Sequence, residues 1–231
     1  LTRLEARPIS LERLQRVHTP AHVNAVKRGA ESGGAAWRGG ETYVSPRSYD
    51  AALLAAGGMV TLVEAVMRGQ VNNGFALVRP PGHHASADEA EGFCLFNNIA
   101  VAARVARDEL GAERVLIVDW DLHHGQGTQY IFQDDPSVLY FSTHQWGIYP
   151  GTGHYSETGS GAGQGFTVNV PLQPGAGDVT YLTIFDELLT PLARRFRPDV
   201  ILVSAGFDTH WRDPLGSMLV TVTGYGAMTQ R

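Results

Sequence analysis

Four short apolar runs of the sequence are each followed by polar side chains that could bind a metal ion or transfer protons. These polar clusters lie at residues 79–84, 119–124, 142–144 and 204–208. In open α/β sheets, ligands bind beyond the carboxyl ends of the strands. We therefore expect the four clusters to meet in one pocket, rather than each capping its own strand.

Asp121 and His123 place two types of metal ligand two residues apart, after the second of these runs. On an extended segment such residues point to the same side, so both could reach one ion. An isolated pair of this kind is often only a polar turn, and the natural third ligand is Asp208, after another apolar run. One imidazole and two carboxylates leave a coordination position open, which is typical of a catalytic site for zinc, iron, cobalt or manganese.

Two adjacent histidines, His83 and His84, follow a proline-rich turn that would hold both imidazoles in place. Beside a metal-bound water, they could act as general base and general acid in attack on a carbonyl. Asp119 precedes Asp121 by two residues and could orient one imidazole from the same side. The alternative for Asp119 is a buried strand-end carboxylate that accepts hydrogen bonds from backbone amides.

Aromatic, glycine-rich segments follow two of the clusters. Gly92 would let the backbone approach a ligand, and Phe93 could form one wall of an apolar tunnel. The loop at residues 146–153 could form the opposite wall, although either aromatic segment could equally belong to the core. Cys94 could be a thiol nucleophile, but the metal-ligand set favours an activated water, which leaves Cys94 as a small buried apolar residue.

The apolar runs alternate along the chain with helical patterns. The runs are at 75–78, 115–118, 138–141, 166–170 and 200–203, and the helices are predicted at 10–15, 19–29, 48–68, 97–109 and 178–196. Gly57-Gly58 should interrupt the third helix, Pro191 could kink the last, and residues 30–46 read as a loop. Continuous apolar strands between helices predict an α/β fold with a mostly parallel central sheet flanked by helices.

Length, composition and charge exclude several classes of protein. The chain has 231 residues, enough for one domain with its own core, and its single cysteine excludes a disulfide scaffold. The formal charge is −5 and the basic residues are scattered, which gives no basic patch for nucleic acid. We see no apolar run of membrane-spanning length and no signal peptide, so we expect a soluble protein of a reducing compartment.

Four motifs together resemble those of the histone deacetylase superfamily, especially its class II and bacterial deacetylase-like branch. They are RPPGHH at 79–84, GFCLFNN at 92–98, VDWDLHHG at 118–125 and AGFD at 205–208. The resemblance implies the three-layer fold of arginase and the deacetylases. It also implies zinc-dependent hydrolysis of an N-acetyl or other N-acyl amide, typically acetyl-lysine.

The resemblance also assigns roles to individual residues. Asp121, His123 and Asp208 match the ligands of one zinc ion. His83 and His84 match the tandem catalytic histidines. Asp119 matches the carboxylate that is paired with the first histidine, and the substrate tunnel is matched by Gly92, Phe93 and Tyr149. A structural potassium site is matched by Asp119, Asp121, His123 and Ser142.

Three features depart from the patterns of the family: two single residues and one motif. Gln126 stands where many members have Asp or Asn near the second histidine, and Leu215 stands where a polyamine-selective branch has an acidic gatekeeper. The catalytic tyrosine of the family belongs to a Gly-Gly-Tyr motif further downstream. Tyr225 comes too early, starts a helix and is not assigned that role. We therefore expect residues 1–231 to be most of one larger catalytic domain, truncated at the C-terminus and also at the N-terminus.

Two other functions stay open at this point. A binuclear manganese ureohydrolase of the same fold would need more carboxylate ligands, and a non-catalytic protein could bind acylated ligands without turnover. For the deacetylase we expect an acylated amine or acetyl-lysine substrate, no nucleic-acid or membrane partner, and a cytoplasmic location. A homo-oligomer is compatible with the sequence, and a nuclear location would fit a eukaryotic source.

Overall fold

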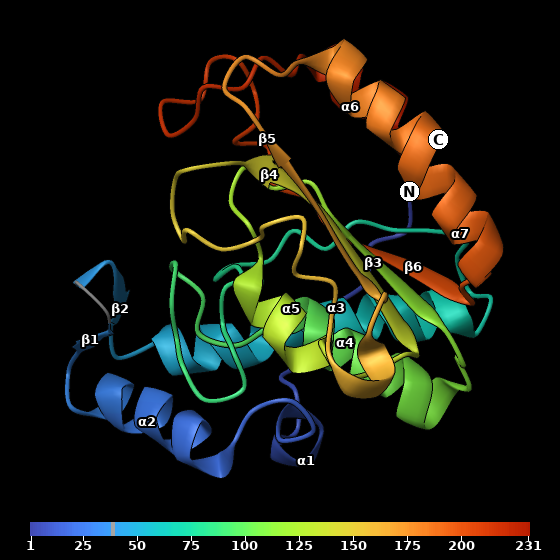
Figure 1. The fold of residues 1–231 in the computed structure, drawn as a ribbon. Coiled ribbons are helices and arrows are strands. Elements are labelled where there is room, and N and C mark those ends of the chain that lie inside the picture. Colours follow the sequence, from blue (N-terminus) through green and yellow to red (C-terminus); the bar gives the residue numbers. More distant parts are fainter. Residues whose placement is uncertain (38–39) are drawn as a thin grey trace. The chain divides into compact units, whose positions relative to one another are not determined.

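A parallel β-sheet carries three of the four polar clusters. The computed structural model describes residues 1–37 and 40–231, which divide into two compact units. The first unit contains Leu1–Ala112 and Gln126–Ile131, and the second contains Glu113–Gly125 and Phe132–Arg231. Figure 1 shows their helices and strands. The single domain predicted from the length stays a prediction.

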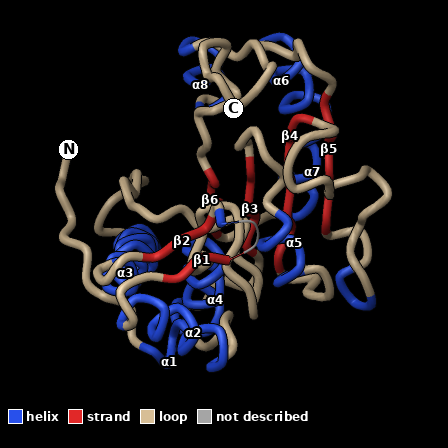
Figure 2. The backbone as a smooth tube through the Cα atoms, turned by 90° about the vertical axis from the view of Figure 1, so that its left-hand side faces the viewer, coloured by secondary structure: helices blue, strands red, loops and turns tan. Residues whose placement is uncertain are grey.

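The sheet lies in the second unit. Its strands are β3 (Val115–Asp119), β4 (Val138–Gln145), β5 (Thr167–Leu172) and β6 (Val200–Ser204), all parallel and in the order β5-β4-β3-β6 (Figure 2). All residues of β3 and β4 are buried, which explains their continuous apolar runs. This confirms the predicted α/β class with a parallel sheet.

The register brings the carboxyl ends of these strands together. Asp119, the last residue of β3, lies opposite Ser142 of β4 and Ser204 of β6. The clusters after β3 and β6 and the polar end of β4 therefore share one edge of the sheet. This is the arrangement predicted for three of the four clusters.

Helices α6 (Asp178–Ile184), α7 (Thr190–Phe196) and α8 (Val222–Thr229) belong to the same unit. A π-helical turn, Phe185–Leu189, joins α6 to α7. The long helix predicted at 178–196 therefore changes from α-helical to π-helical geometry just before Pro191. A hydrophobic core forms between the sheet and the helices, with Leu116 and Phe141 from the strands and Tyr181, Phe185 and Met228 from the helices.

The strand predicted at residues 75–78 is absent, although the residues are described. Leu77 is 90% exposed, whereas Ala76 and Val78 are partly buried. An apolar run becomes a buried strand only where neighbouring strands pair with its backbone and helices cover its faces. The run alone could not distinguish a sheet strand from an extended segment, and this part of the prediction was wrong.

The first unit contains α1 (Leu11–Leu14), α2 (Pro20–Glu31), α3 (Ser48–Met67), α4 (Asn98–Leu110) and most of α5 (Gln126–Phe132). Side chains cap the N-termini of two of these helices. The side chain of Thr19 accepts a hydrogen bond from the His22 N–H, and Asn97 accepts one from the Ala100 N–H. Gly111 ends α4 with a φ of 79°.

Within the predicted loop at 30–46, the described residues form two antiparallel strands instead, β1 (Ala35–Trp37) and β2 (Thr42–Val44), and residues 38 and 39 lie outside the described part. Helix α2 continues past Gly29, where the predicted helix ends, to Glu31. A Cβ atom at Gly29 would lie 2.9 Å from the Cβ of Ala35. The glycine therefore permits close packing of β1 on the helix and does not terminate the helix.

Helix α3 runs without a break through Gly57 and Gly58, contrary to the predicted interruption. A Cβ at Gly57 would lie 1.7 Å from the carbonyl oxygen of Arg7, and the Ile9 N–H donates to the Leu53 carbonyl at 3.0 Å. These contacts show that the N-terminal segment packs directly on the helix backbone. The glycine pair makes that close approach possible.

Replacing Gly57 with Ala should therefore destabilise the protein by about 1–3 kcal/mol, the usual cost of overpacking. Helix propensity alone predicts the opposite sign, because Ala is favoured over Gly in a helix interior. Gly226→Ala in α8, where a Cβ meets no atom within 4 Å, is the matched control and should not destabilise. Urea unfolding of both variants checks the prediction, and equal or increased stability of Gly57→Ala would contradict it.

Helix α3 also meets the length and hydropathy criteria for crossing a membrane, with a mean hydropathy of 1.6 over its most apolar window. The sequence reading that no apolar run approaches that length was therefore wrong. Such a helix is weak evidence for a membrane span, because core helices of soluble proteins meet the same criteria. Ala52, Ala56, Val60 and Val63 of α3 are buried within the protein.

Candidate metal site and flanking residues

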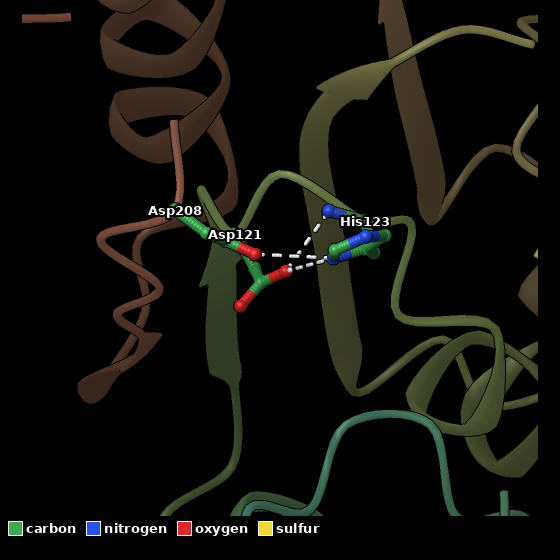
Figure 3. Close-up of side chains that lie close together, drawn as sticks. All are labelled: Asp121, His123 and Asp208. Atoms are coloured by element: carbon green, nitrogen blue, oxygen red, sulfur yellow. Dashed lines mark hydrogen bonds and ion pairs between the residues drawn. The ribbon is translucent and has the colours of Figure 1, made fainter. Parts of the chain in front are cut away.

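Asp121, His123 and Asp208 converge at the carboxyl edge of the sheet in the second unit (Figure 3). One potential ligand atom from each residue lies within 4.8 Å of the others. The His123 Nδ1 is 3.3 Å from Asp121 Oδ1 and 3.1 Å from Asp208 Oδ2. The first two residues follow β3 and the third follows β6, so the adjacency of these strands assembles the predicted set of ligands.

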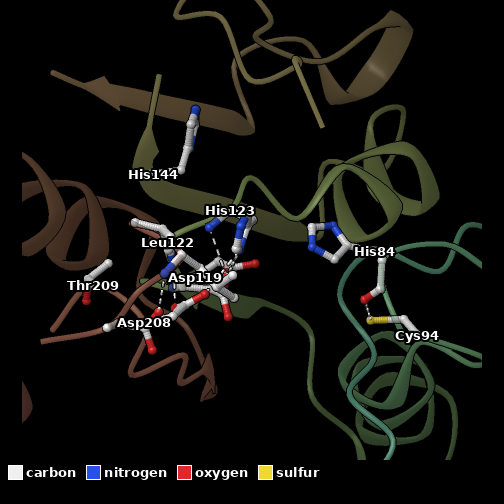
Figure 4. A network of polar contacts seen from close by, with 12 residues as sticks. His84, Cys94, Asp119, Leu122, His123, His144, Asp208 and Thr209 are labelled. Atoms are coloured by element: carbon white, nitrogen blue, oxygen red, sulfur yellow. Dashed lines mark hydrogen bonds and ion pairs between the residues drawn. The ribbon is translucent and has the colours of Figure 1, made fainter. Parts of the chain in front are cut away.

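Backbone amides hold both carboxylates in place. The Leu122 N–H donates to Asp208 Oδ1 and the His123 N–H donates to Asp121 Oδ1, each at 2.9 Å (Figure 4). The remaining carboxylate oxygens of the two residues are not used by these backbone bonds. The segment after β3 therefore orients a ligand from its own chain and one from the neighbouring strand end.

The electrostatics of this cluster suit a cation. Burial opposes a charge on His123, but Asp121 and Asp208 outweigh it and raise the pKa of the imidazole to about 9. Burial, together with the nearby Asp121, raises the pKa of Asp208. Two partly buried carboxylates and an imidazole nitrogen are an established ligand set for a catalytic divalent ion. The residues present fit a zinc ion.

Asp119 is fully buried beside this set. Its Oδ1 accepts the Asp121 N–H at 3.2 Å, and its Oδ2 accepts the hydroxyl of Tyr140 at 3.1 Å. The backbone bond agrees with the interpretation of Asp119 as a strand-end carboxylate. Tyr140 was missed because it lies inside an apolar strand, where a tyrosine gives no sign of its hydrogen bonds. The pairing of Asp119 with His83 stays a prediction.

Gly206 makes the approach of Asp121 to the end of β6 possible. A Cβ at this position would lie 2.1 Å from Asp121 Oδ2 and 2.6 Å from its Cα. The AGFD motif thus needs glycine for a steric reason that the sequence did not reveal.

Ser142 and Tyr149 lie in the same unit as the triad. Ser142 is fully buried opposite Asp119, and its Oγ is 2.9 Å from His144 Nδ1. The ring of Tyr149 lies 6.1 Å from the ring of His123, centroid to centroid, in an edge arrangement. Tyr149 therefore lies beside a candidate metal ligand, and its role in lining the substrate tunnel stays a prediction. The potassium site of Asp119, Asp121, His123 and Ser142 stays a prediction.

His83 and His84 are both buried in the first unit, with ring centroids 4.0 Å apart. His84 Nδ1 lies 2.6 Å from Gln126 Oε1, and the His83 carbonyl accepts the Thr128 N–H at 3.0 Å. An amide oxygen can only accept a hydrogen bond, so His84 carries a proton on Nδ1. The structure thus gives Gln126 a contact with the second histidine.

Gly92 and Phe93 form a tight turn between Glu91 and Cys94, with φ values of 55° and 65°. A Cβ at Gly92 would lie 2.2 Å from His84 Cδ2, so only glycine admits the imidazole. Phe93 is 57% exposed, and its N–H donates to Thr42 Oγ1 at 3.0 Å. Phe93 is therefore presented at the surface and is not a core residue, which leaves its ring available to line a tunnel.

Cys94 is fully buried, and its thiol donates to the Gly92 carbonyl (Figure 4). This placement agrees with the prediction of a small buried residue.

Two buried histidines that the sequence analysis did not single out hold the segment that follows Cys94. His18 Nε2 accepts the Asn97 N–H, and the His22 Nε2–H donates to the Leu95 carbonyl, each at 2.8 Å. Burial lowers the pKa of His18 to about 3, so its ring is neutral and can accept.

Tyr225 lies within α8, and its hydroxyl is 2.6 Å from Thr209 Oγ1. Burial raises the pKa of the phenol to about 12. Leu215, which the family resemblance matches to an acidic gatekeeper, is exposed. The structure thus brings together Asp119, Asp121, His123, Ser142, Tyr149 and Asp208 in the second unit, and His83, His84, Gly92, Phe93 and Gln126 in the first.

The second unit thus combines a parallel α/β sheet with a candidate carboxylate–imidazole metal site at its carboxyl edge. The model of the histone deacetylase domain matches residues 1–231 of the chain. The chain therefore belongs to the histone deacetylase family.

Known proteins resemble the chain over 81–99% of its length. It is 49% identical to the crystal structure of the HDA15 HD domain, with a TM-score of 0.96, over 98% of this chain and 67% of that one. A probable deacetylase of Archaeoglobus fulgidus is 43% identical over 99% of this chain and 63% of its own length. The polyamine deacetylase HDAC10 of Rattus norvegicus is 52% identical over 81% of this chain and 33% of its own. The chain thus spans one third to two thirds of these curated relatives.

Proposed function

We propose that the protein is a zinc-dependent deacetylase that hydrolyses N-acetyl, or other N-acyl, amides. The observation that carries this proposal is the convergence of Asp121, His123 and Asp208 at the carboxyl edge of the sheet. These three residues would hold one zinc ion. Bound there, zinc would polarise the acyl carbonyl and make a water molecule more acidic.

The two histidines would move the protons. His84 donates its Nδ1–H to Gln126, which leaves Nε2 as the basic nitrogen that accepts a proton from the attacking water. His83 would return a proton to the leaving amine, oriented by Asp119. Because Gln126 is neutral, it fixes the tautomer of His84 without stabilising the charged imidazolium as a carboxylate would.

Acetyl-lysine is the substrate that we favour, with Gly92, Phe93 and Tyr149 lining the path of its side chain. Leu215 supports this choice over an acetylated polyamine, because an apolar side chain cannot pair with a second ammonium group. We further propose that Asp119, Asp121, His123 and Ser142 bind a structural potassium ion through main-chain and side-chain oxygens. Potassium would be expected to stabilise the end of β3.

Metal analysis combined with an acetyl-lysine peptide assay tests the proposal. We expect one zinc per chain and release of acetate, with slower turnover of acetylspermidine. Two manganese ions per chain would instead favour the ureohydrolase. Binding of the peptide without acetate release, in a protein that retains zinc, would favour the non-catalytic alternative.

A further inference from the structure

Two histidines of the second unit, His124 and His144, are almost fully buried but are not candidate metal ligands. Their rings lie 4.8 Å apart, centroid to centroid. His124 directly follows His123, and His144 lies two residues after Ser142 on β4. Buried imidazoles need hydrogen-bond partners, and their partners indicate what they hold in place.

His144 joins the sheet to the following loop. Its Nε2 is 2.9 Å from the Gly153 carbonyl, so this nitrogen carries the proton and donates. Its Nδ1 is 2.9 Å from Ser142 Oγ. With the proton on Nε2, the unprotonated Nδ1 accepts the serine hydroxyl.

His124 contacts the same part of the loop. Its Nδ1 is 2.8 Å from Thr152 Oγ1, one residue before the glycine that His144 holds. A Cβ at Gly153, whose φ is 88°, would lie 2.5 Å from His144 Nε2 and 2.6 Å from His124 Cγ. The glycine backbone therefore fits directly against the two imidazoles.

The loop at residues 146–157 carries Tyr149, whose ring lies 6.1 Å from that of His123. At the C-terminal end of the loop, the carboxylate of Glu157 accepts hydrogen bonds from the N–H groups of Gly153 and His154. The contacts at Thr152 and Gly153 are thus three and four residues from Tyr149. Movement of the loop away from the imidazoles would also release Tyr149 from its place beside the metal ligand.

We propose that His124 and His144 are positioning residues that hold this loop against the sheet, so that Tyr149 stays beside His123 of the candidate metal site. They act on substrate binding through the loop and do not touch the reacting atoms. The substrate role rests on the proposed function, whereas the attachment of the loop does not.

The test compares hydrogen–deuterium exchange of residues 146–157 with steady-state kinetics in the zinc-loaded protein. In Thr152→Val and His144→Leu, we expect exchange in the loop to be about three- to tenfold faster, the effect of losing one hydrogen bond. KM for an acetyl-lysine peptide should rise by a similar factor, with kcat changed less than about twofold. His144→Gln retains an N–H donor for the Gly153 carbonyl and should restore part of both.

His154→Asn is the matched control, because His154 lies in the same loop but its Nδ1 contacts Ser156 within the loop itself. It should leave exchange at 151–153 and KM unchanged. Wild-type exchange of the loop in Thr152→Val and His144→Leu would overturn the proposal. Loss of zinc with unchanged loop exchange would also overturn it, because the histidines would then act on the metal site. If the wild-type protein releases no acetate, the proposed function fails, while the exchange result still decides the attachment of the loop.

Discussion

Replacing Asp208 with Asn should remove bound zinc and lower kcat/KM for an acetyl-lysine peptide by at least about 10²–10⁴-fold. Asp208 is the ligand contributed from the end of β6, and its Oδ2 contacts the His123 ring at 3.1 Å. The amide is neutral and binds a zinc ion far more weakly than a carboxylate does. The side chains of Asn and Asp are nearly the same size, so the fold should persist and the loss should reflect the ligand.

Zinc content after dialysis, the peptide assay and thermal unfolding together check this prediction. Asp213→Asn is the matched control, since Asp213 is a carboxylate in the same segment whose Oδ1 accepts the Leu215 N–H. It should retain zinc and turnover. A folded Asp208→Asn variant with wild-type zinc content would show that Asp208 is not a metal ligand.

Replacing Gly206 with Ala should also lower zinc affinity and kcat/KM, although the candidate ligands themselves stay unchanged. The added Cβ would lie 2.1 Å from Asp121 Oδ2 and 2.6 Å from Asp121 Cα. A new rotamer of Asp121 could relieve the first contact but not the second, which involves the backbone. Either the strand end or Asp121 must move, and we expect zinc affinity to fall at least about tenfold and kcat/KM at least about 10²-fold, as misplacement of a catalytic group produces.

Zinc titration with a chromophoric chelator and the same peptide assay measure this effect. Gly226→Ala is again the control, because it adds the same methyl group where no atom lies within 4 Å. It should bind zinc and turn over normally. If Gly206→Ala matched Gly226→Ala in zinc affinity, the close approach of Asp121 to Gly206 would not be needed for the site.

Several features were predictable because they depend on local physics. A run of β-branched and aliphatic residues such as 115–118 predicts a strand buried on both faces, and Thr19 and Asn97 mark helix starts through their own hydrogen bonds. The two-residue spacing of Asp121 and His123 places both on one side of an extended segment. The motifs at 79–84, 92–98, 118–125 and 205–208 then indicated the family.

Other features required the tertiary structure, because they depend on which segments become neighbours. Asp208 joins Asp121 and His123 only because β6 lies next to β3, and strand order is not written in any local pattern. The same residue types can also have opposite roles. Gly57-Gly58 suggested a break in a helix, but it is the contact with Arg7 that requires Gly57.

The sequence alone therefore determined the class of fold, the candidate ligands and the family. The tertiary structure decided which side chains act together and why particular positions must be small or polar. Tyr140 reaches Asp119, and His124 and His144 hold the loop of Tyr149, through contacts between strands and a loop. The physical reason is that hydrogen bonds and steric contacts depend on distances in space, which spacing along the chain specifies only within one element.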